Sequence, residues 1–172
     1  MIHSDKSGPT RRQLLAGGGA LAITSLTSTG AFASSQKSAR MKLAIVGTGS
    51  RGTRSWGKPV VDSYSDVVEL VGLCDINSKR VHAAKALMGT QAPTYLDFDR
   101  MVQETKPDTI MVTTVDSTHY RYINRAMELG GDVITEKPMC TDEAQCQSIL
   151  DMQKKTGRKV TVTFNARYAR KI

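Results

Sequence analysis

The sequence has few of the residues that would mark a metalloprotein, a disulfide-linked protein or a nucleic-acid binder. It holds three cysteines in 172 residues. They form no Cys-x-x-Cys pair and have no histidine at zinc-ligand spacing, so we predict no metal site and no required disulfide. Aromatic residues make up 5% of the chain, and no basic run is longer than two or three residues. The net charge of +8 therefore indicates a solvated surface, and we expect no nucleic-acid partner.

Long hydrophobic runs are also absent. The mildly apolar run from Leu14 to Leu26 contains three consecutive glycines with several serines and threonines, so we expect no stable membrane span. It overlaps Thr10-Arg11-Arg12-Gln13-Leu14-Leu15, which resembles a twin-arginine export motif, and precedes an A-x-A cleavage site at Ala31-Phe32-Ala33. We interpret residues 1–33 as a twin-arginine signal peptide and 34–40 as a linker, which predicts a periplasmic or secreted protein. The alternative is a disordered N-terminal extension.

The stretch around which the remaining chain is organised is Met41–Gly52. An apolar strand, Leu43 to Val46, runs directly into Gly47-x-Gly49-x-x-Gly52. In a dinucleotide-binding loop the first glycine permits a sharp turn, the second allows close approach of a pyrophosphate, and the third lets the next helix pack on the sheet. Asp75 closes a second apolar strand, as the fingerprint requires. The sequence therefore predicts dinucleotide binding.

Apolar strands alternate with helical segments along residues 41–165. We expect strands at 43–46, 67–74, 94–95, 109–114, 132–135 and 160–164, with helices beginning near residues 50, 77, 97–99, 118 and 143. Gly57 and Pro59 predict a break of the first helix at residues 56–59, and we expect Asp116–Ser117 to cap the fourth. The pattern predicts an α/β fold, a doubly wound and mostly parallel sheet of order 3-2-1-4-5-6, with ligands at the carboxyl ends of its strands.

Candidate functional residues follow those strand ends. Asp75 is placed to accept hydrogen bonds from the adenosine ribose, which favours NAD over NADP, although Lys79 and Arg80 soften that preference. Lys137 is the best candidate for chemistry, because partial burial would suit it to proton transfer; the alternative is a lysine that merely pairs with Glu136. His119 either contacts the cofactor or is a structural residue at a helix end.

Several segments together resemble the Gfo/Idh/MocA oxidoreductases, which act on sugars, cyclitols and related carbohydrates with NAD(P). They are the glycine loop, Cys74-Asp75, Val112-Thr113-Thr114 with His119, and the two segments Gly130–Pro138 and Phe164-Asn165-x-Arg167-Tyr168. The resemblance implies a Rossmann fold and a catalytic or substrate-orienting role for Lys137. It also implies cofactor contacts from Gly47, Thr48, Gly49, Ser50, Arg51, Gly52, Asp75, Thr114, His119, Glu136 and Lys137. Asp116 and Ser117 depart from the Pro-Asn that the family often has.

Members of that family continue into an α+β domain that binds the substrate, so we interpret residues 166–172 as the start of the crossover to it. The resemblance predicts an oxidoreductase acting on a carbohydrate by hydride transfer, with NAD held tightly because the leader predicts export. Two alternatives stay open: an exported NAD-dependent glycosidase that uses transient oxidation, and a non-catalytic dinucleotide-binding fragment. In the family one face of the sheet packs on that second domain. We expect this face to be exposed here, which favours self-association into a homo-oligomer.

Overall fold

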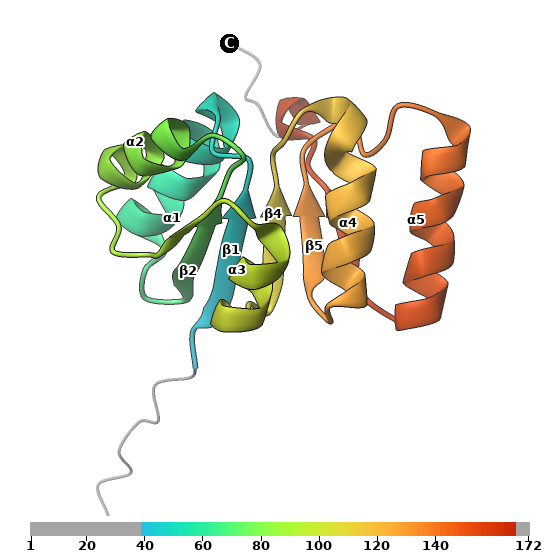
Figure 1. The fold of residues 1–172 in the computed structure, drawn as a ribbon, viewed down its shortest axis with the longest axis horizontal. Coiled ribbons are helices and arrows are strands. Elements are labelled where there is room, and N and C mark those ends of the chain that lie inside the picture. The colour runs from blue at the N-terminus through green and yellow to red at the C-terminus, as the bar shows by residue number, and fades with distance from the viewer. Residues whose placement is uncertain (1–38, 168–172) are drawn as a thin grey trace, which may run out of the picture. The chain divides into compact units, whose positions relative to one another are not determined.

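The computed structural model describes residues 39–167, which form a six-stranded parallel sheet of order β3-β2-β1-β4-β5-β6 (Figure 1). The predicted fold class and strand order are thus confirmed. The strands are β1 Met41–Val46, β2 Val68–Cys74, β3 Thr94–Tyr95, β4 Thr109–Val112, β5 Asp132–Thr135 and β6 Val160–Val162. The α-helices are α1 Lys58–Ser63, α2 Ser78–Met88, α3 Phe98–Thr105, α4 His119–Glu128 and α5 Glu143–Thr156. The leader prediction falls on residues outside those described.

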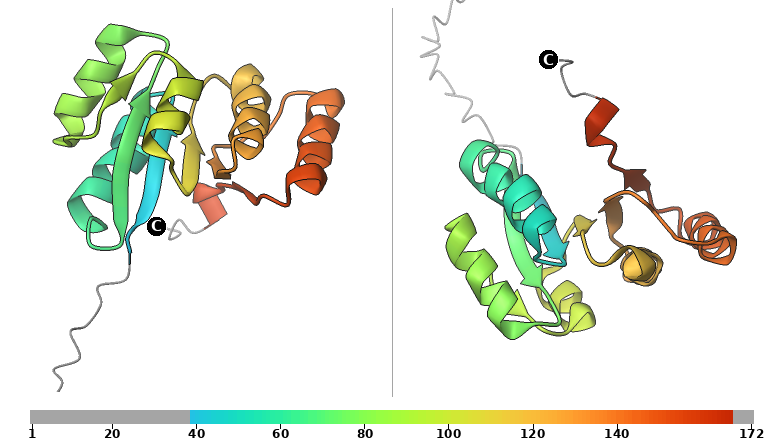
Figure 2. Two further views of the ribbon diagram at one scale, coloured as in Figure 1. Left: turned by 60° about the horizontal axis from the view of Figure 1, so that its bottom comes forward. Right: turned by 90° about the horizontal axis from the view of Figure 1, so that it is seen from above.

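Helices lie on both faces of the sheet around β1, so the central strands are apolar on both sides (Figures 1 and 2). On one face α3, α4 and α5 pack against the sheet, and on the other lie α2 and the helical segment that follows the glycine loop. Strand β1 alternates between these two layers: Ala44 and Val46 join the first, and Leu43 and Ile45 join the second. This double burial explains why the strands read as nearly continuous apolar runs.

Polar side chains begin the helices where the sequence predicts. Asn77, Asp97 and Asp142 each accept a hydrogen bond from the backbone N–H three residues ahead, at the starts of α2, α3 and α5. Gly89 and Gly157 end α2 and α5 in the left-handed conformation. These local signals place the helices to within a residue or two of the expected bounds.

The predicted break at residues 56–59 is wrong. Residues Arg51–Gly57 form a π-helix that runs without interruption into α1, and the Lys58 N–H donates to the Thr53 carbonyl five residues earlier. Pro59 is the second residue of α1, so the N–H that it lacks falls where the hydrogen-bond pattern changes from that of the π-helix to that of the α-helix. The irregularity that the sequence predicts here is therefore a widened turn of a continuous helix.

The predicted cap at Asp116–Ser117 is also wrong. Asp116–Thr118 form a 3₁₀ turn, and α4 begins at His119 without a side-chain cap. The Thr118 hydroxyl donates instead to the Val115 carbonyl at 2.7 Å, and its oxygen lies 3.0 Å from the Thr114 hydroxyl. Such local side-chain bonds compete with a regular helix start.

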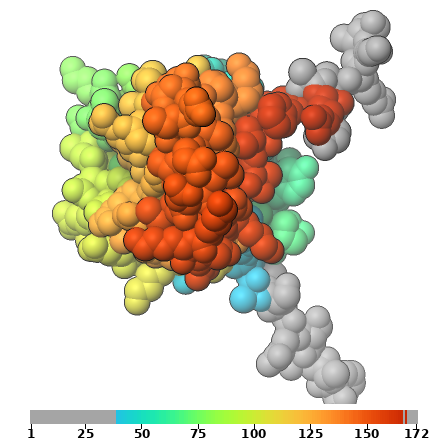
Figure 3. Space-filling view, turned by 90° about the vertical axis from the view of Figure 1, so that its right-hand side faces the viewer, coloured from blue at the N-terminus to red at the C-terminus, as the bar shows by residue number. Residues whose placement is uncertain are grey.

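Strand β6 lies at one edge of the sheet beside α5, which covers the face shown in Figure 3. A 3₁₀ turn, Asn165–Arg167, follows β6 and projects from the body of the domain in that view. Within residues 39–167 no helix is both long and apolar enough to cross a membrane.

Candidate functional site

The glycine loop has the geometry of a phosphate-binding turn. Gly47 adopts φ +89°, and a Cβ there would lie 2.6 Å from the backbone carbonyl of Thr113 and the N–H nitrogen of Thr114. A Cβ on Gly52 would meet the Gly47 carbonyl oxygen, so this glycine allows the helix to pack tightly on the strand. A Cβ on Gly49, by contrast, would meet nothing within 4 Å. The space over Gly49 is thus open to a ligand, which fits the pyrophosphate of a dinucleotide.

Asp75 lies at the carboxyl end of β2 and is buried. Its Oδ2 accepts hydrogen bonds from the Thr48 N–H at 2.8 Å and from the Thr48 hydroxyl at 3.0 Å. Its Oδ1 accepts from the Asn77 N–H at 2.9 Å, and the Arg80 Nη1 lies 3.6 Å from the same oxygen. The carboxylate therefore fixes the glycine loop against the end of β2. It also borders the open space beside Gly49 in which a ligand would lie.

A crevice of about 290 Å³ lies between the carboxyl ends of β1, β2 and β4. These strand ends point to the upper edge of the sheet in Figure 1. It is lined by Val46, Gly47, Gly49, Asp75, Ile76, Arg80, Thr113, Thr114, Val115, Thr118 and Tyr122. Strands β1 and β4 are the neighbours at which the strand order reverses, where open α/β sheets bind their ligands. Ile76 and Val115, which are 84% and 70% exposed, flank it as apolar walls suited to a flat base.

Glu136, at the end of β5, is held by the first helix and not by its neighbour Lys137. Its Oε1 accepts hydrogen bonds from the Arg51 Nη2 at 2.5 Å and from the Trp56 indole N–H at 2.6 Å. The carboxylate is buried, so the Arg51 charge and the indole donor compensate it. Trp56 also packs against the core layer beneath the π-helix. This network ties the glycine-loop helix to the end of β5.

Lys137 is exposed, where the sequence prediction requires partial burial. It lines a second cavity at the same edge of the sheet, of about 620 Å³, together with Arg51, Glu136, Phe164, Asn165 and Arg167. Within residues 39–167 its ammonium group makes no hydrogen bond or ion pair. The peptide bond to Pro138 is cis. The lysine is therefore available to a ligand and is not occupied by Glu136.

His119 is fully buried and joins two of the loops at this edge. Its Nδ1 lies 2.7 Å from the Pro138 carbonyl oxygen, and its Nε2 lies 3.1 Å from the Thr114 carbonyl oxygen. These contacts connect the loop after β4 with the loop after β5. Of the two interpretations from the sequence, the geometry supports the structural one, in which His119 holds the shape of the crevice.

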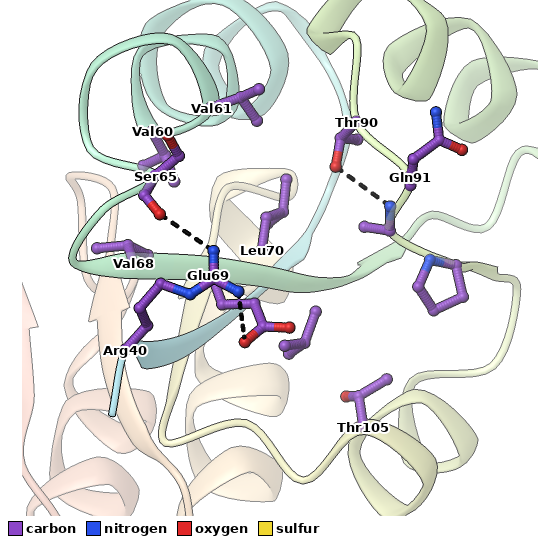
Figure 4. A pocket seen from close by; sticks show the side chains of 13 residues that line it. Arg40, Val60, Val61, Ser65, Val68, Glu69, Leu70, Thr90, Gln91 and Thr105 are labelled. Carbon is purple, nitrogen blue, oxygen red and sulfur yellow. Dashed lines mark hydrogen bonds and ion pairs between the residues drawn. The ribbon is translucent and has the colours of Figure 1, made fainter. Parts of the chain in front are cut away.

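A further cavity, of about 420 Å³, lies at the opposite end of β2 (Figure 4). Arg40 crosses its rim, with Nη1 3.1 Å from the Ser65 carbonyl oxygen and Nη2 3.2 Å from the Glu69 carboxylate. Val68 and Leu70 line it from the amino-terminal half of β2. Because parallel sheets bind ligands at their carboxyl ends, this cavity is not part of the dinucleotide site.

Sequence reasoning missed several residues of the site. It did not pair Arg51 with Glu136, nor did it place Ile76, Val115 or Tyr122 at the crevice. The available signal for Ile76 and Val115 was an apolar residue two or three positions after the end of a strand, where the chain turns at the carboxyl edge of the sheet. Within residues 39–167 no group of three or more His, Cys, Asp or Glu side chains could hold a metal ion.

This crevice, with its glycine turn and strand-end aspartate, defines a dinucleotide-binding domain of the Rossmann type. The chain belongs to the Gfo/Idh/MocA family, described as "Oxidoreductase family, NAD-binding Rossmann fold", which matches residues 41–164.

The chain is 35% identical over 131 residues to the Bacillus subtilis protein named "Putative oxidoreductase YteT", covering 74% of this chain and 31% of that protein. It is 32% identical over 123 residues to inositol 2-dehydrogenase of Klebsiella pneumoniae, covering 70% of this chain and 35% of that protein. The WlbA dehydrogenase of Chromobacterium violaceum, solved with NADH and UDP-GlcNAcA, superposes with a TM-score of 0.68 at 26% identity. The match covers 75% of this chain and 36% of that chain. The chain thus spans about a third of the length of these relatives.

Proposed function

We propose that residues 41–165 bind NAD at the carboxyl edge of the sheet and that the protein transfers hydride between NAD and a sugar or cyclitol. The observation that carries this proposal is the open space over Gly49 beside the buried carboxylate of Asp75. The names and bound ligands of the relatives support the dehydrogenase chemistry and the substrate class. A bound nicotinamide would supply the carbon that gives or takes the hydride.

The chain's own residues hold the dinucleotide and transfer a proton to or from the substrate. The N–H groups of residues 49–52, at the start of the helical segment, would face the pyrophosphate, and Asp75 would accept from the ribose. The N–H groups of Gly47 and Thr48 donate instead to the Cys74 carbonyl and to Asp75. Lys137, which has no partner among the described residues, exchanges a proton with the substrate hydroxyl that loses or gains hydrogen. Arg51 and Trp56 hold Glu136 in place beside it.

Export by the twin-arginine route remains part of the proposal, supported by the motif at Thr10–Leu15 and the cleavage site at Ala31-Phe32-Ala33. Since nicotinamide cofactors do not exchange freely outside the cytoplasm, we expect the cofactor to be held tightly. Replacing Arg11 and Arg12 by lysine in a fusion of residues 1–40 to a periplasmic reporter tests the route. Unchanged export of the reporter would exclude it.

The glycosidase alternative uses the same dinucleotide site, but the dehydrogenase relatives reported above favour net oxidoreduction. The two chemistries differ in their products. Incubation of the full chain with NAD and nitrophenyl glycosides would release a phenol only in the glycosidase reaction. A non-catalytic domain would bind NAD and turn over neither class of substrate.

The direct test of the proposed function is calorimetric titration of the full chain with NAD, followed by turnover with a panel of cyclitols and sugars. We expect NAD binding to the chain. In any form of the protein that turns over, Lys137→Ala should lower the rate by about 10²–10⁴-fold with the cofactor still bound. Lys159→Ala, at an exposed lysine before β6, is the matched control and should leave the rate unchanged. A normal rate for Lys137→Ala would make that lysine structural.

A further inference from the structure

The loop after β5 and the first turn of α5 carry two cysteines, which line neither cavity of the candidate site. Cys140 belongs to the irregular segment between β5 and α5, and Cys146 is the fourth residue of α5. Both cysteines are free and half-buried, whereas Cys74, the third cysteine of the chain, is buried in the core. The pair therefore carries chemistry that the proposed dinucleotide site does not use.

The hydrogen bonds that begin α5 fold the two cysteines toward each other. Asp142 precedes the helix, and its carbonyl accepts a hydrogen bond from the Cys146 N–H at 3.2 Å. The N–H and the hydroxyl of Thr141 both donate to the Gln145 side-chain oxygen at 3.1 Å. Each of these last two residues is the sequence neighbour of one cysteine, so the thiols come within hydrogen-bonding reach. Burial, and then the hydrogen bond with the Cys146 thiol, raise the pKa of Cys140.

The chain before α5 can adapt to a bond between these thiols. A disulfide needs sulfur atoms about 2 Å apart and a Cβ–S–S–Cβ dihedral angle of about 90°. Cys146 is fixed by α5, but Cys140 belongs to no helix or strand, so its backbone can turn to meet that geometry. Its side chain packs against the core cluster that includes Ile123 of α4 and Ile149 of α5, which limits the positions that its thiol can take.

We propose that Cys140 and Cys146 are a site of reversible oxidation, at which a low-molecular-weight disulfide such as oxidised glutathione converts the two thiols into a disulfide bridge. One thiolate first attacks the oxidant, forms a mixed disulfide and releases one reduced thiol. The other thiolate then attacks the protein sulfur of the mixed disulfide, forms the bridge and releases the second reduced thiol. The two released thiols take up the two protons that the cysteines lose, and the two electrons reduce the oxidant.

The bridge would join α5 to the segment that carries Lys137 and Pro138. The Pro138 carbonyl already lies 2.7 Å from the His119 Nδ1, so the oxidised segment would be held at both sides. A bridge that forms only under oxidising conditions agrees with the prediction that the fold requires no disulfide. The proposal needs no bound dinucleotide and is therefore independent of the proposed function.

Peptide mass spectrometry of the full chain, after incubation with oxidised glutathione and alkylation of the remaining thiols in urea, tests the proposal. Both cysteines lie on the tryptic peptide 126–154, because trypsin does not cleave before Pro138. We expect this peptide to lose two hydrogen atoms and to carry no alkyl group, and dithiothreitol should restore both thiols. Cys74, on the peptide 55–79, is the internal control and should stay reduced, because its thiol is buried.

Two variants and a comparison with the unfolded chain show whether the fold brings the thiols together. Cys140→Ser and Cys146→Ser should each abolish the bridge and leave a mixed disulfide with glutathione on the remaining cysteine. The equilibrium constant for bridge formation with glutathione should be at least about tenfold larger in the folded chain than in concentrated urea, since the hydrogen bonds at the start of α5 exist only in the fold. Circular dichroism of each variant checks that it is folded.

Three results would overturn the proposal. The first is a peptide 126–154 that keeps both thiols, or that carries glutathione on both cysteines without a bridge. The second is a bond between two chains in place of the internal bridge, seen as a dimer on non-reducing electrophoresis. The third is an equilibrium constant that is no larger in the folded chain than in urea. None of these results bears on NAD binding, which calorimetry measures separately.

Discussion

Replacement of Gly47 by alanine should lower the free energy of unfolding of the domain. The loss should be larger than for alanine at any other described glycine with positive φ. Two costs act together. A non-glycine residue at φ +89° costs about 1–2 kcal/mol. The added Cβ would also lie 2.6 Å from the backbone of Thr113 and Thr114, which β4 can relieve only by moving. Overpacking of this kind costs about 1–3 kcal/mol, so we expect a total loss of about 2–5 kcal/mol.

Gly89→Ala separates the two costs. Gly89 has φ +69°, but its Cβ would meet nothing within 4 Å, so only the conformational cost of about 1–2 kcal/mol applies. Equilibrium unfolding in urea, followed by circular dichroism and by the fluorescence of the single tryptophan, measures both variants. If Gly47→Ala loses no more stability than Gly89→Ala, the close approach of residue 47 to Thr113 and Thr114 costs nothing, and the predicted second cost is refuted.

Two further predictions concern titratable groups. The Arg125 guanidinium, which donates to both oxygens of Asp99, lowers the pKa of that carboxyl. Since the folded pKa lies below the unfolded one, the stabilisation is present above about pH 4 and is lost as the pH falls through the folded value. Asp99→Asn should therefore lower the free energy of unfolding at pH 7 by no more than about 1 kcal/mol, because both side chains are roughly 40% exposed. Urea unfolding should show that this difference shrinks as the pH falls below about 4, and a difference that stays constant would exclude the ion pair. Burial, aided by the charge of Asp75, raises the pKa of the Cys74 thiol to about 12. Alkylation of Cys74 by iodoacetamide at pH 8 should thus be about a thousandfold slower in the folded protein than in urea, and equal rates by peptide mass spectrometry would place the thiol at the surface.

The fold could be predicted from the sequence because its signals are local and repeated. An unbroken apolar run such as Leu43–Val46 fits only a central strand that is buried on both faces of the sheet. Asn77, Asp97 and Asp142 begin helices by accepting a hydrogen bond from the N–H three residues ahead, which is a local signal. The π-helix was not predictable in this way. Gly52 packs closely on Thr113 and Gly57 on Met88 of α2, and these neighbours are 61 and 31 positions away in the sequence.

The sequence predicted which residues lie at the candidate site, but it did not predict which of them contact one another. The residues at the strand ends were identified because parallel strands place their carboxyl ends at one edge. The pairing of Glu136 with Arg51 joins residues 85 positions apart, and His119 reaches the Pro138 carbonyl from 19 positions away. No spacing rule links such pairs, so the sequence left open a Lys137–Glu136 pair, and the structure pairs Glu136 with Arg51 instead.

The most direct test of the central claim is calorimetric titration of the full chain and of its Gly49→Ala variant with NAD. The Gly49 Cβ would point into open space, so the variant should unfold at an unchanged urea concentration. That space is the one we assign to the pyrophosphate, so the variant should bind NAD at least about tenfold more weakly, because the methyl group prevents close approach of the backbone. Equal NAD affinity of the two proteins would contradict the assignment of this edge of the sheet as the dinucleotide site.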